Sequence, residues 1–262
     1  MAVIRSHAVT AAVPAAAVLA VLLAGCGGGS TELTSAGLPG DGPTRTATTA
    51  PAVIEPSGPA AARSAADLLR AARAAFVAAR SVHVTGTAVR GSDAYVVDLR
   101  LKGAAGGTAT IRTSGQTVEV IRIGDVAYVG GDLAFWRGVT GEENQARAMV
   151  GSFVRVPARQ GNFGQFTVFT FPDVVTAVLP DPAAPATVGA RTTIGGRAAI
   201  PVRDTAGGTL SVAASGPAYP LRLDGLSSGQ VVFLDFTDYG ADVPLVAPPV
   251  RSVVTGGPGQ GS

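Results

Sequence analysis

The chain has 262 residues, of which 47% are hydrophobic and only 15% are charged, and its formal net charge is +2. This length fits one domain with flexible ends or two small domains. The low charge and the scattered basic residues argue against a disordered protein and against a nucleic-acid partner. One Cys and two His are too few for a zinc site of about four such ligands. We therefore expect neither a metal nor a cofactor.

Residues 1–25 predict a secretory signal peptide. One fixed charge, Arg5, precedes an uncharged and largely apolar stretch over residues 8–25, which ends in small residues. A charged start, an apolar middle and a small-residue exit are typical of such signals. Pro14 interrupts the stretch and no stop-transfer charges follow it, so a permanent transmembrane helix is the weaker interpretation.

The signal ends in Leu23-Ala24-Gly25-Cys26, which resembles the lipobox of bacterial lipoproteins. This resemblance implies that Cys26 is acylated, with palmitate-type chains, and becomes the new N-terminus. Each buried CH₂ contributes about 0.8 kcal/mol, so two or three chains hold a protein where one holds it only marginally. We expect a lipid-anchored protein on the outer face of the bacterial cytoplasmic membrane. The alternative is a chance cysteine after an ordinary signal.

A linker rich in Gly, Pro, Ser and Thr follows over residues 26–62. About 36 residues of flexible chain have a root-mean-square span of roughly 30–36 Å. The expected organisation is then a signal at 1–25, the lipidated cysteine and linker at 26–62, a folded domain at 63–250 and a flexible tail at 251–262.

The folded domain opens with a predicted amphipathic helix over residues 63–80, because Leu68, Leu69, Ala72 and Phe76 recur at helical spacing. The hydrophobic period then changes to two, which predicts an antiparallel meander. The expected strands are residues 81–89, 95–102, 108–113, 117–123, 126–129 and 133–136. The apolar register shifts within the strand over 117–123, which indicates a bulge.

The middle of the domain predicts helices and an aromatic loop. A helix is expected at 141–153 and a short one at 172–179. The glycine-rich stretch between them carries Phe163, Phe166 and Phe169, which we expect to be exposed around a portal, since exposed aromatics need a reason. Strands resume at 187–194, 198–204, 208–214, 218–224 and 229–237, and we expect the last of them to be buried on both faces.

The order of helix, strands, helices and strands lacks βαβ alternation, which makes a parallel sheet unfavourable. We expect an α+β fold in which a large twisted antiparallel sheet forms an open half-barrel. The helices cover its concave face, and a hydrophobic cavity for lipid lies between the two layers. Periodicity alone does not separate a hollow interior from a solid one.

Several short motifs together resemble the LppX/LprA/LprF/LprG family of actinobacterial lipoproteins over residues 63–250. They are Ser81-Val82-His83, Ile123-Gly124-Asp125-Val126-Ala127-Tyr128 with Trp136, Thr193-Ile194-Gly195-Gly196-Arg197, and Asp238-Tyr239-Gly240-Ala241-Asp242-Val243 with Pro248-Pro249. The resemblance implies a half-barrel related to the LolA/LolB-like lipoprotein carriers. It also implies a hydrophobic cavity for acylated lipids or glycolipids that are carried across the cell envelope. The family commonly has Trp where this chain has Tyr239.

Apolar residues that alternate along the strands, with those of the first helix and the aromatic loop, are candidates to line the cavity. They are Phe76, Tyr95, Val97, Leu99, Leu101, Val118, Val120, Phe163, Phe166, Phe169, Leu210, Val212, Tyr219, Leu221 and Leu223.

The sequence favours a binding protein over an enzyme. His83 sits in an alternating strand, where a structural role is expected, and neither a GxSxG elbow nor a phosphate-binding loop is present. We expect an extracytoplasmic lipid carrier whose partners are an acylated lipid or glycolipid, the membrane through its anchor, and a membrane transporter as a further candidate. The alternative is a structural or transporter-accessory envelope lipoprotein with a solid core.

Overall fold

A computed structural model describes residues 63–255 apart from 160, 162 and 228. The signal, the linker, Cys26 and its lipobox residues Leu23, Ala24 and Gly25 lie outside the described residues. Within the described part of the chain, no helix is both long enough and apolar enough to cross a membrane.

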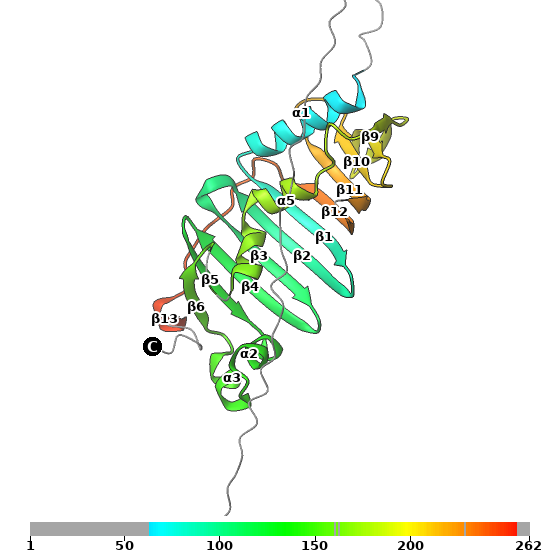
Figure 1. Cartoon of the computed structure of the whole chain (residues 1–262). Coiled ribbons are helices and arrows are strands. Elements are labelled where there is room, and N and C mark those ends of the chain that lie inside the picture. The colour runs from blue at the N-terminus through cyan, green and yellow to red at the C-terminus, as the bar shows by residue number, and fades with distance from the viewer. Residues whose placement is uncertain (1–62, 160, 162, 228, 256–262) are drawn as a thin grey trace, which may run out of the picture. The chain divides into compact units, whose positions relative to one another are not determined.

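A single open sheet dominates the fold (Figure 1). Its strands run in the order β13-β6-β5-β4-β3-β2-β1-β12-β11-β10-β9-β7, and β8 pairs with β9 off this path. Only the pairing of β13 with β6 is parallel among the described pairs. The strands are β1 (Val82–Arg90), β2 (Asp93–Lys102), β3 (Gly106–Thr113), β4 (Gln116–Ile123), β5 (Val126–Gly131), β6 (Phe153–Pro157), β7 (Ala186–Val188), β8 (Thr192–Ile194), β9 (Arg197–Asp204), β10 (Thr209–Ala213), β11 (Pro220–Ser227), β12 (Gln230–Thr237) and β13 (Val253–Thr255).

The helices lie on one face of this sheet, which we call the inner face (Figure 1). α1 contacts β7, β9 and β11, whereas α2 contacts β4 and β5, and η2 lies over β2, β3 and β4. The expected α+β open half-barrel with a one-sided helix layer is confirmed. The helical elements are α1 (Ala65–Ala78), η1 (Gly103–Ala105), α2 (Leu133–Thr140), α3 (Glu143–Met149), α4 (Gly164–Thr167), η2 (Val168–Thr170), α5 (Pro172–Val178) and η3 (Val250–Ser252).

Alternation along the strands builds the core. The register places Val84, Leu99, Ala109, Val120 and Val129 opposite one another from β1 to β5, and each of these is buried. Because side chains alternate between faces with period two, one such row fixes the whole inner face as apolar. The opposite face, which we call the outer face, is mostly polar.

Residues 133–136 were expected as a strand, and this prediction is wrong. They begin helix α2, because the Asp132 side chain caps the helix by accepting a hydrogen bond from the Phe135 amide at 2.9 Å. Asp is among the preferred N-cap residues. The aromatic pair Phe135 and Trp136 is then buried by the helix instead of being split between two faces of a strand.

The bulge expected in β4 is also absent, since the register of β4 with both neighbours runs without a shift. The apolar pattern changes because Arg122 occupies the inner-face position that follows Val118 and Val120. An arginine in a strand is normally expected to face solvent. Because Arg122 faces the interior instead, the sequence pattern falsely indicated a change of register.

Two further expectations are corrected. Strand β12 is not buried on both faces, since Val231 and Phe233 are 41% and 56% exposed on the outer face. The sheet also continues beyond residue 250, where we expected the domain to end, because Val253 pairs with Phe153. Phe153 accordingly begins strand β6 instead of closing a helix over 141–153.

Candidate functional site: the interior between sheet and helices

Most of the residues predicted to line a cavity belong to one continuous apolar cluster between the sheet and the helices, which we call the inner cluster. Each of these side chains is at most 8% exposed. They are Phe76, Val97, Leu99, Leu101, Val118, Val120, Phe163, Phe166, Leu210, Val212 and Leu223. The structure thus brings together residues from α1, from the strands β2, β4, β10 and β11, and from the stretch expected to be a loop.

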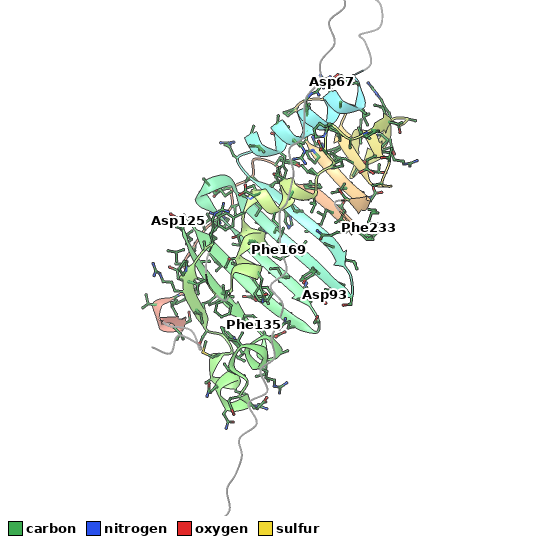
Figure 2. The ribbon with its side chains drawn as sticks, in the orientation of Figure 1. Asp67, Asp93, Asp125, Phe135, Phe169 and Phe233 are labelled. Atoms are coloured by element: carbon green, nitrogen blue, oxygen red, sulfur yellow. The ribbon has the colours of Figure 1, made fainter. Side chains whose placement is uncertain are left out.

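Two predicted lining residues lie at the rim of the inner cluster. Tyr95 on β2 and Phe169 on η2 are half-buried and pack against it. Their ring centroids are 6.1 Å apart, and Phe169 lies in front of the middle strands (Figure 2). These two rings therefore stand where the interior approaches solvent.

Tyr219 and Leu221 were expected to share a face with Leu223, and this is wrong. The register between β10 and β11 shifts between Ser211 and Val212. As a result, Leu221 and Tyr219 pack with Ala199 and Ala213 in a separate small cluster. Leu223 remains in the inner cluster. An extra residue in one strand reverses which face the following side chains occupy.

Phe163 and Phe166 are not exposed around a portal, as we had expected, but are 6% and 8% exposed. The stretch folds into the short turns of α4 and η2, which press both rings onto the ring of Phe135 at centroid distances of 6.1 and 5.7 Å. The aromatic residues that suggested a portal therefore fill the interior.

Trp136 carries an unmatched polar atom in this apolar interior. The residue is fully buried, and its Nε1 is the one buried side-chain nitrogen or oxygen in the described residues without a hydrogen-bond partner. A buried polar group without a partner costs about 1–3 kcal/mol. The sequence placed Trp136 in a family motif, but nothing in the sequence indicated that its N–H lacks an acceptor.

Arg122 ties the helix layer to the sheet. Its guanidinium donates five hydrogen bonds to the main-chain carbonyls of Gly103, Ala104, Gly124 and Thr170. It also lies 4.0 Å from the centroid of the Phe171 ring. Burial lowers the pKa of Arg122, and the nearby charge of Arg159 lowers it further. Sequence reasoning missed this residue.

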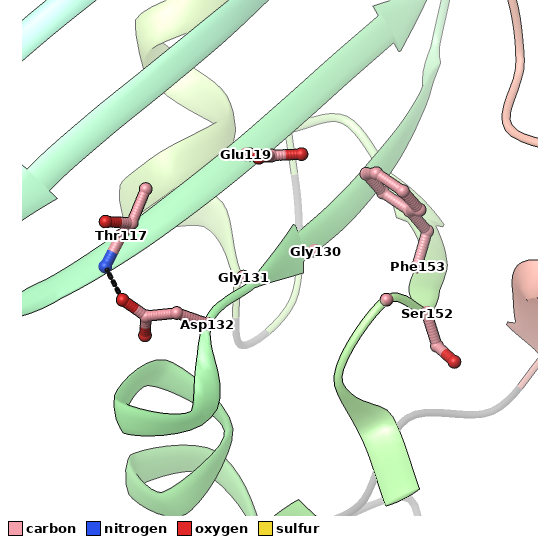
Figure 3. A pocket seen from close by; sticks show the side chains of 8 residues that line it. Thr117, Glu119, Gly130, Gly131, Asp132, Ser152 and Phe153 are labelled. Atoms are coloured by element: carbon pink, nitrogen blue, oxygen red, sulfur yellow. Dashed lines mark hydrogen bonds between the residues drawn. The ribbon is translucent and has the colours of Figure 1, made fainter. Parts of the chain in front are cut away.

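Two pockets open away from the inner cluster. A pocket of about 200 Å³ is lined by Thr117, Glu119, Gly130, Gly131, Asp132, Gly151, Ser152 and Phe153, and Asp132 there accepts a hydrogen bond from the Thr117 amide at 2.7 Å (Figure 3). Another, of about 340 Å³, is lined by Arg222, Asp224, Phe233, Leu234 and Asp235.

His83 lies on the outer face between two carboxylates. Its Nε2 is 2.8 Å from Asp98 Oδ1, and its Nδ1 is 3.3 Å from Asp238 Oδ2. These contacts join the first strands to the segment after β12, which fits the structural role expected for His83. Among the described residues, no group of three His, Cys, Asp or Glu side chains is placed to hold a metal ion.

No protein-family model and no curated protein matches the chain, whereas solved structures do. LprF from Mycobacterium bovis is 18% identical with a TM-score of 0.44, and the match covers 70% of this chain and 96% of that one. LppX from Mycobacterium tuberculosis is 13% identical with a TM-score of 0.40, covering 70% and 98%. A LolA superfamily protein from Nitrosomonas europaea is 17% identical with a TM-score of 0.29, covering 70% and 96%. At these identities the likeness concerns the fold alone.

Proposed function

We propose that the protein is a membrane-anchored, extracytoplasmic lipoprotein that binds acylated lipids or glycolipids between its sheet and its helices and carries them through the cell envelope. The observation that carries this proposal is the inner cluster. It extends over the inner face of the sheet from β6 to β9, on one side only, and encloses the unpaired N–H of Trp136. No covalent chemistry is required, because burial of acyl chains supplies about 0.8 kcal/mol for each CH₂.

For a ligand to enter, the cover over the middle strands would have to separate from the sheet, and the hydrogen bonds from Arg122 to Thr170 would have to break. α4, η2 and α5 contain four, three and seven residues, so each turn buries only a few side chains. Elements with few buried contacts open at lower free energy than the core strands. Acyl chains would take the space that Phe163 and Phe166 fill.

The structure offers the polar end of such a ligand a hydrogen-bond donor and a place at the rim of the inner cluster. The Trp136 N–H is free to donate to an ester or hydroxyl oxygen, which would remove the cost of leaving it unpaired. Tyr95 and Phe169 would flank the entrance, where a headgroup stays in water while the acyl chains are buried. Amphipathic aromatic side chains such as Tyr suit a boundary that is apolar on one side and wet on the other.

The competing function is an envelope lipoprotein with a solid core, and the close packing of the inner cluster favours it. The experiment is to purify the full chain from a bacterial host, extract it with organic solvent and identify the co-purifying lipids. We expect acylated lipid in a fixed molar ratio to protein. A folded chain that neither co-purifies with lipid nor takes up acyl chains offered to it would exclude the carrier.

A matched pair of variants locates the lipid. Val97 and Val96 are neighbours on β2, but Val97 is buried in the inner cluster and Val96 is 45% exposed on the outer face. Val97→Phe fills inner space and should reduce the bound lipid, whereas Val96→Phe should leave it unchanged. Overpacking a core costs about 1–3 kcal/mol, so circular dichroism is used to check that both variants fold. Equal lipid content in both variants would place the lipid elsewhere.

The anchor has its own test. Cys26→Ser should release the chain from the membrane fraction into the soluble fraction. Membrane sedimentation of the variant at the level of the native chain would contradict lipidation at Cys26 and would leave the lipid-binding proposal standing.

A further inference from the structure

Exposed apolar side chains gather at one end of the outer face. Phe233 is 56% exposed, Val96 45%, and Leu226 and Val231 41% each. Exposed apolar side chains that form a contiguous patch, unlike single ones, mark interaction sites. Phe233 lies toward the end of the sheet that carries the turn before Asp93 (Figure 2), and we call this end the hairpin end.

The strand register makes these residues one patch. Leu226, Val231, Val89 and Ala94 face one another across β11, β12, β1 and β2. Phe233, Thr87 and Val96 form the next row. Neighbours within a row have Cβ atoms about 5 Å apart, and the rows are spaced by about 7 Å. We call these seven residues the outer band.

Charge flanks the band and does not enter it. Asp224 and Arg112 stand at the two ends of the second row. The third row holds Arg222 and Asp235, joined by a 2.6 Å ion pair, together with Asp98. Asp93, at the turn, alternates onto the inner side with Tyr95. Among these three rows, the apolar side chains are therefore confined to the two rows next to the hairpin end.

We propose that the outer band is a docking surface for a lipid bilayer, on which the domain rests while its interior exchanges acyl chains. This inference rests on the anchor in the proposed function. About 36 residues of linker between Cys26 and the domain, with a root-mean-square span of roughly 30–36 Å, would hold the domain near the bilayer. A lipid surface is then the apolar partner present at the highest local concentration.

The dimensions of the outer band fit this occupant. Apolar faces that bind at the interface enter the boundary between headgroups and acyl chains by about 5–10 Å, and the two rows span about 7 Å along the strands. The charged side chains that flank the band, Arg112 and Asp224 in the second row and Arg222, Asp235 and Asp98 in the third, would then lie at the level of the headgroups. A protein partner would instead favour an apolar centre surrounded by a polar rim, whereas the band runs to the end of the strands.

A single tryptophan reports this contact. In a Trp136→Phe background, Phe233→Trp places an indole in the outer band of the full chain, and Arg100→Trp places one in the charged part of the same face. Vesicles of phosphatidylcholine that include lipid brominated in the acyl chains are then added. We expect the emission of the indole at 233 to shift to the blue and to lose most of its intensity, while the indole at 100 changes little.

Two outcomes would overturn the inference. One is equal quenching, or none, at positions 233 and 100 when the chain floats with the vesicles. The other is an indole at 233 that iodide cannot reach before vesicles are added, which would indicate that a second copy of the chain covers the band. Either result leaves the co-purification of lipid untouched, so failure of the docking surface is distinguishable from failure of the carrier. A further variant tests the band without an indole at 233. In a Trp136→Phe chain that carries Leu226→Trp, the additional change Phe233→Asp should weaken vesicle contact, so the indole at position 226 should be quenched less.

Discussion

At the scale of single residues, Arg122 shows how a charge can stabilise an apolar interior. Its five hydrogen bonds satisfy the carbonyl groups of two turns, at residues 103–104 and at Gly124, and of Thr170 in the covering layer. The stacked Phe171 ring is held from its other side by Arg159 at 3.9 Å. One side chain thus orders elements that are distant in sequence.

We expect Arg122→Met to lower the free energy of unfolding by about 3 kcal/mol or more, because it leaves several buried carbonyls without a donor. Arg122→Lys should recover only part of this, since an ammonium group lacks the planar fork that reaches several acceptors. Urea unfolding measures the effect. Arg112→Met, on the exposed part of β3, is the control and should change stability by less than about 0.5 kcal/mol. Similar losses at positions 112 and 122 would contradict this role.

Gly86 permits close approach of two backbones in the middle of β1. Its φ is +149°, and a Cβ placed there would lie 1.9 Å from the carbonyl oxygen of Phe233. We expect Gly86→Ala to cost about 2 kcal/mol or more, since β1 and β12 must separate and the backbone conformation is strained. Thermal unfolding measures this. Gly138→Ala should instead stabilise α2 by roughly 0.5–1 kcal/mol, because nothing lies near its Cβ position.

At the scale of elements, the strands could be predicted and the covering layer could not. Alternation fixed the inner face of β2, where Val97 and Leu99 are buried as expected. It failed at α2, because four apolar residues without a polar contrast suit a short buried strand as well as a helix. Asp132 was the signal for the helix, since it stands at the N-cap. The β11 irregularity left no trace in composition.

The aromatic stretch failed for a different reason. A glycine-rich stretch with several phenylalanines predicts a loop. Whether its rings face solvent depends on the surface that lies beneath them. Here Phe135 and the inner face of β4 supply an apolar surface for Phe163 and Phe166. That surface is assembled from residues distant in sequence, so no local pattern reveals it.

The junction of α2 and α3 should depend on pH. The Arg137 side chain, by hydrogen bonding to the Glu143 carboxylate, lowers the pKa of that group to about 2, and Arg147 adds to the effect. Because the pKa of Glu143 in the folded chain lies below its ordinary value of 4.5, the ion pair stabilises the junction fully above that pH. This contribution is lost as the pH falls through the range from 4.5 to 2.

Carboxyl NMR titration of Glu143 measures this directly, and Glu143→Gln should remove the corresponding step from the acid unfolding profile. Both partners are exposed, with 51% of the Arg137 and 42% of the Glu143 side chain accessible, so added salt should weaken the effect. A Glu143 carboxyl that titrates near its ordinary pKa would contradict the ion pair.

At the scale of the whole domain, the two proposals assign separate tasks to the two faces of one sheet. The inner face is mostly apolar, with Arg122 as a buried exception, and helices cover it. The outer face carries exposed apolar side chains in the two rows at the hairpin end and charged side chains in the row that follows. Since alternate residues of the same strands serve both faces, neighbours such as Val96 and Val97 can be changed independently. The two proposals therefore predict separable effects.

Cargo binding should appear as added stability. A ligand that binds only the folded chain raises the free energy of unfolding by about 2.7 kcal/mol when its free concentration is 100 times its Kd. We expect the delipidated full chain to gain stability from a short-chain phosphatidylglycerol kept below its micelle concentration. Val97→Phe should lose most of this gain and Trp136→Phe part of it, whereas Phe233→Asp should keep it, because the outer band does not touch the interior. Thermal unfolding with and without the lipid measures each gain. An equal gain in all four proteins would mean that the lipid binds outside the inner cluster, and no gain in the native chain would favour the solid core.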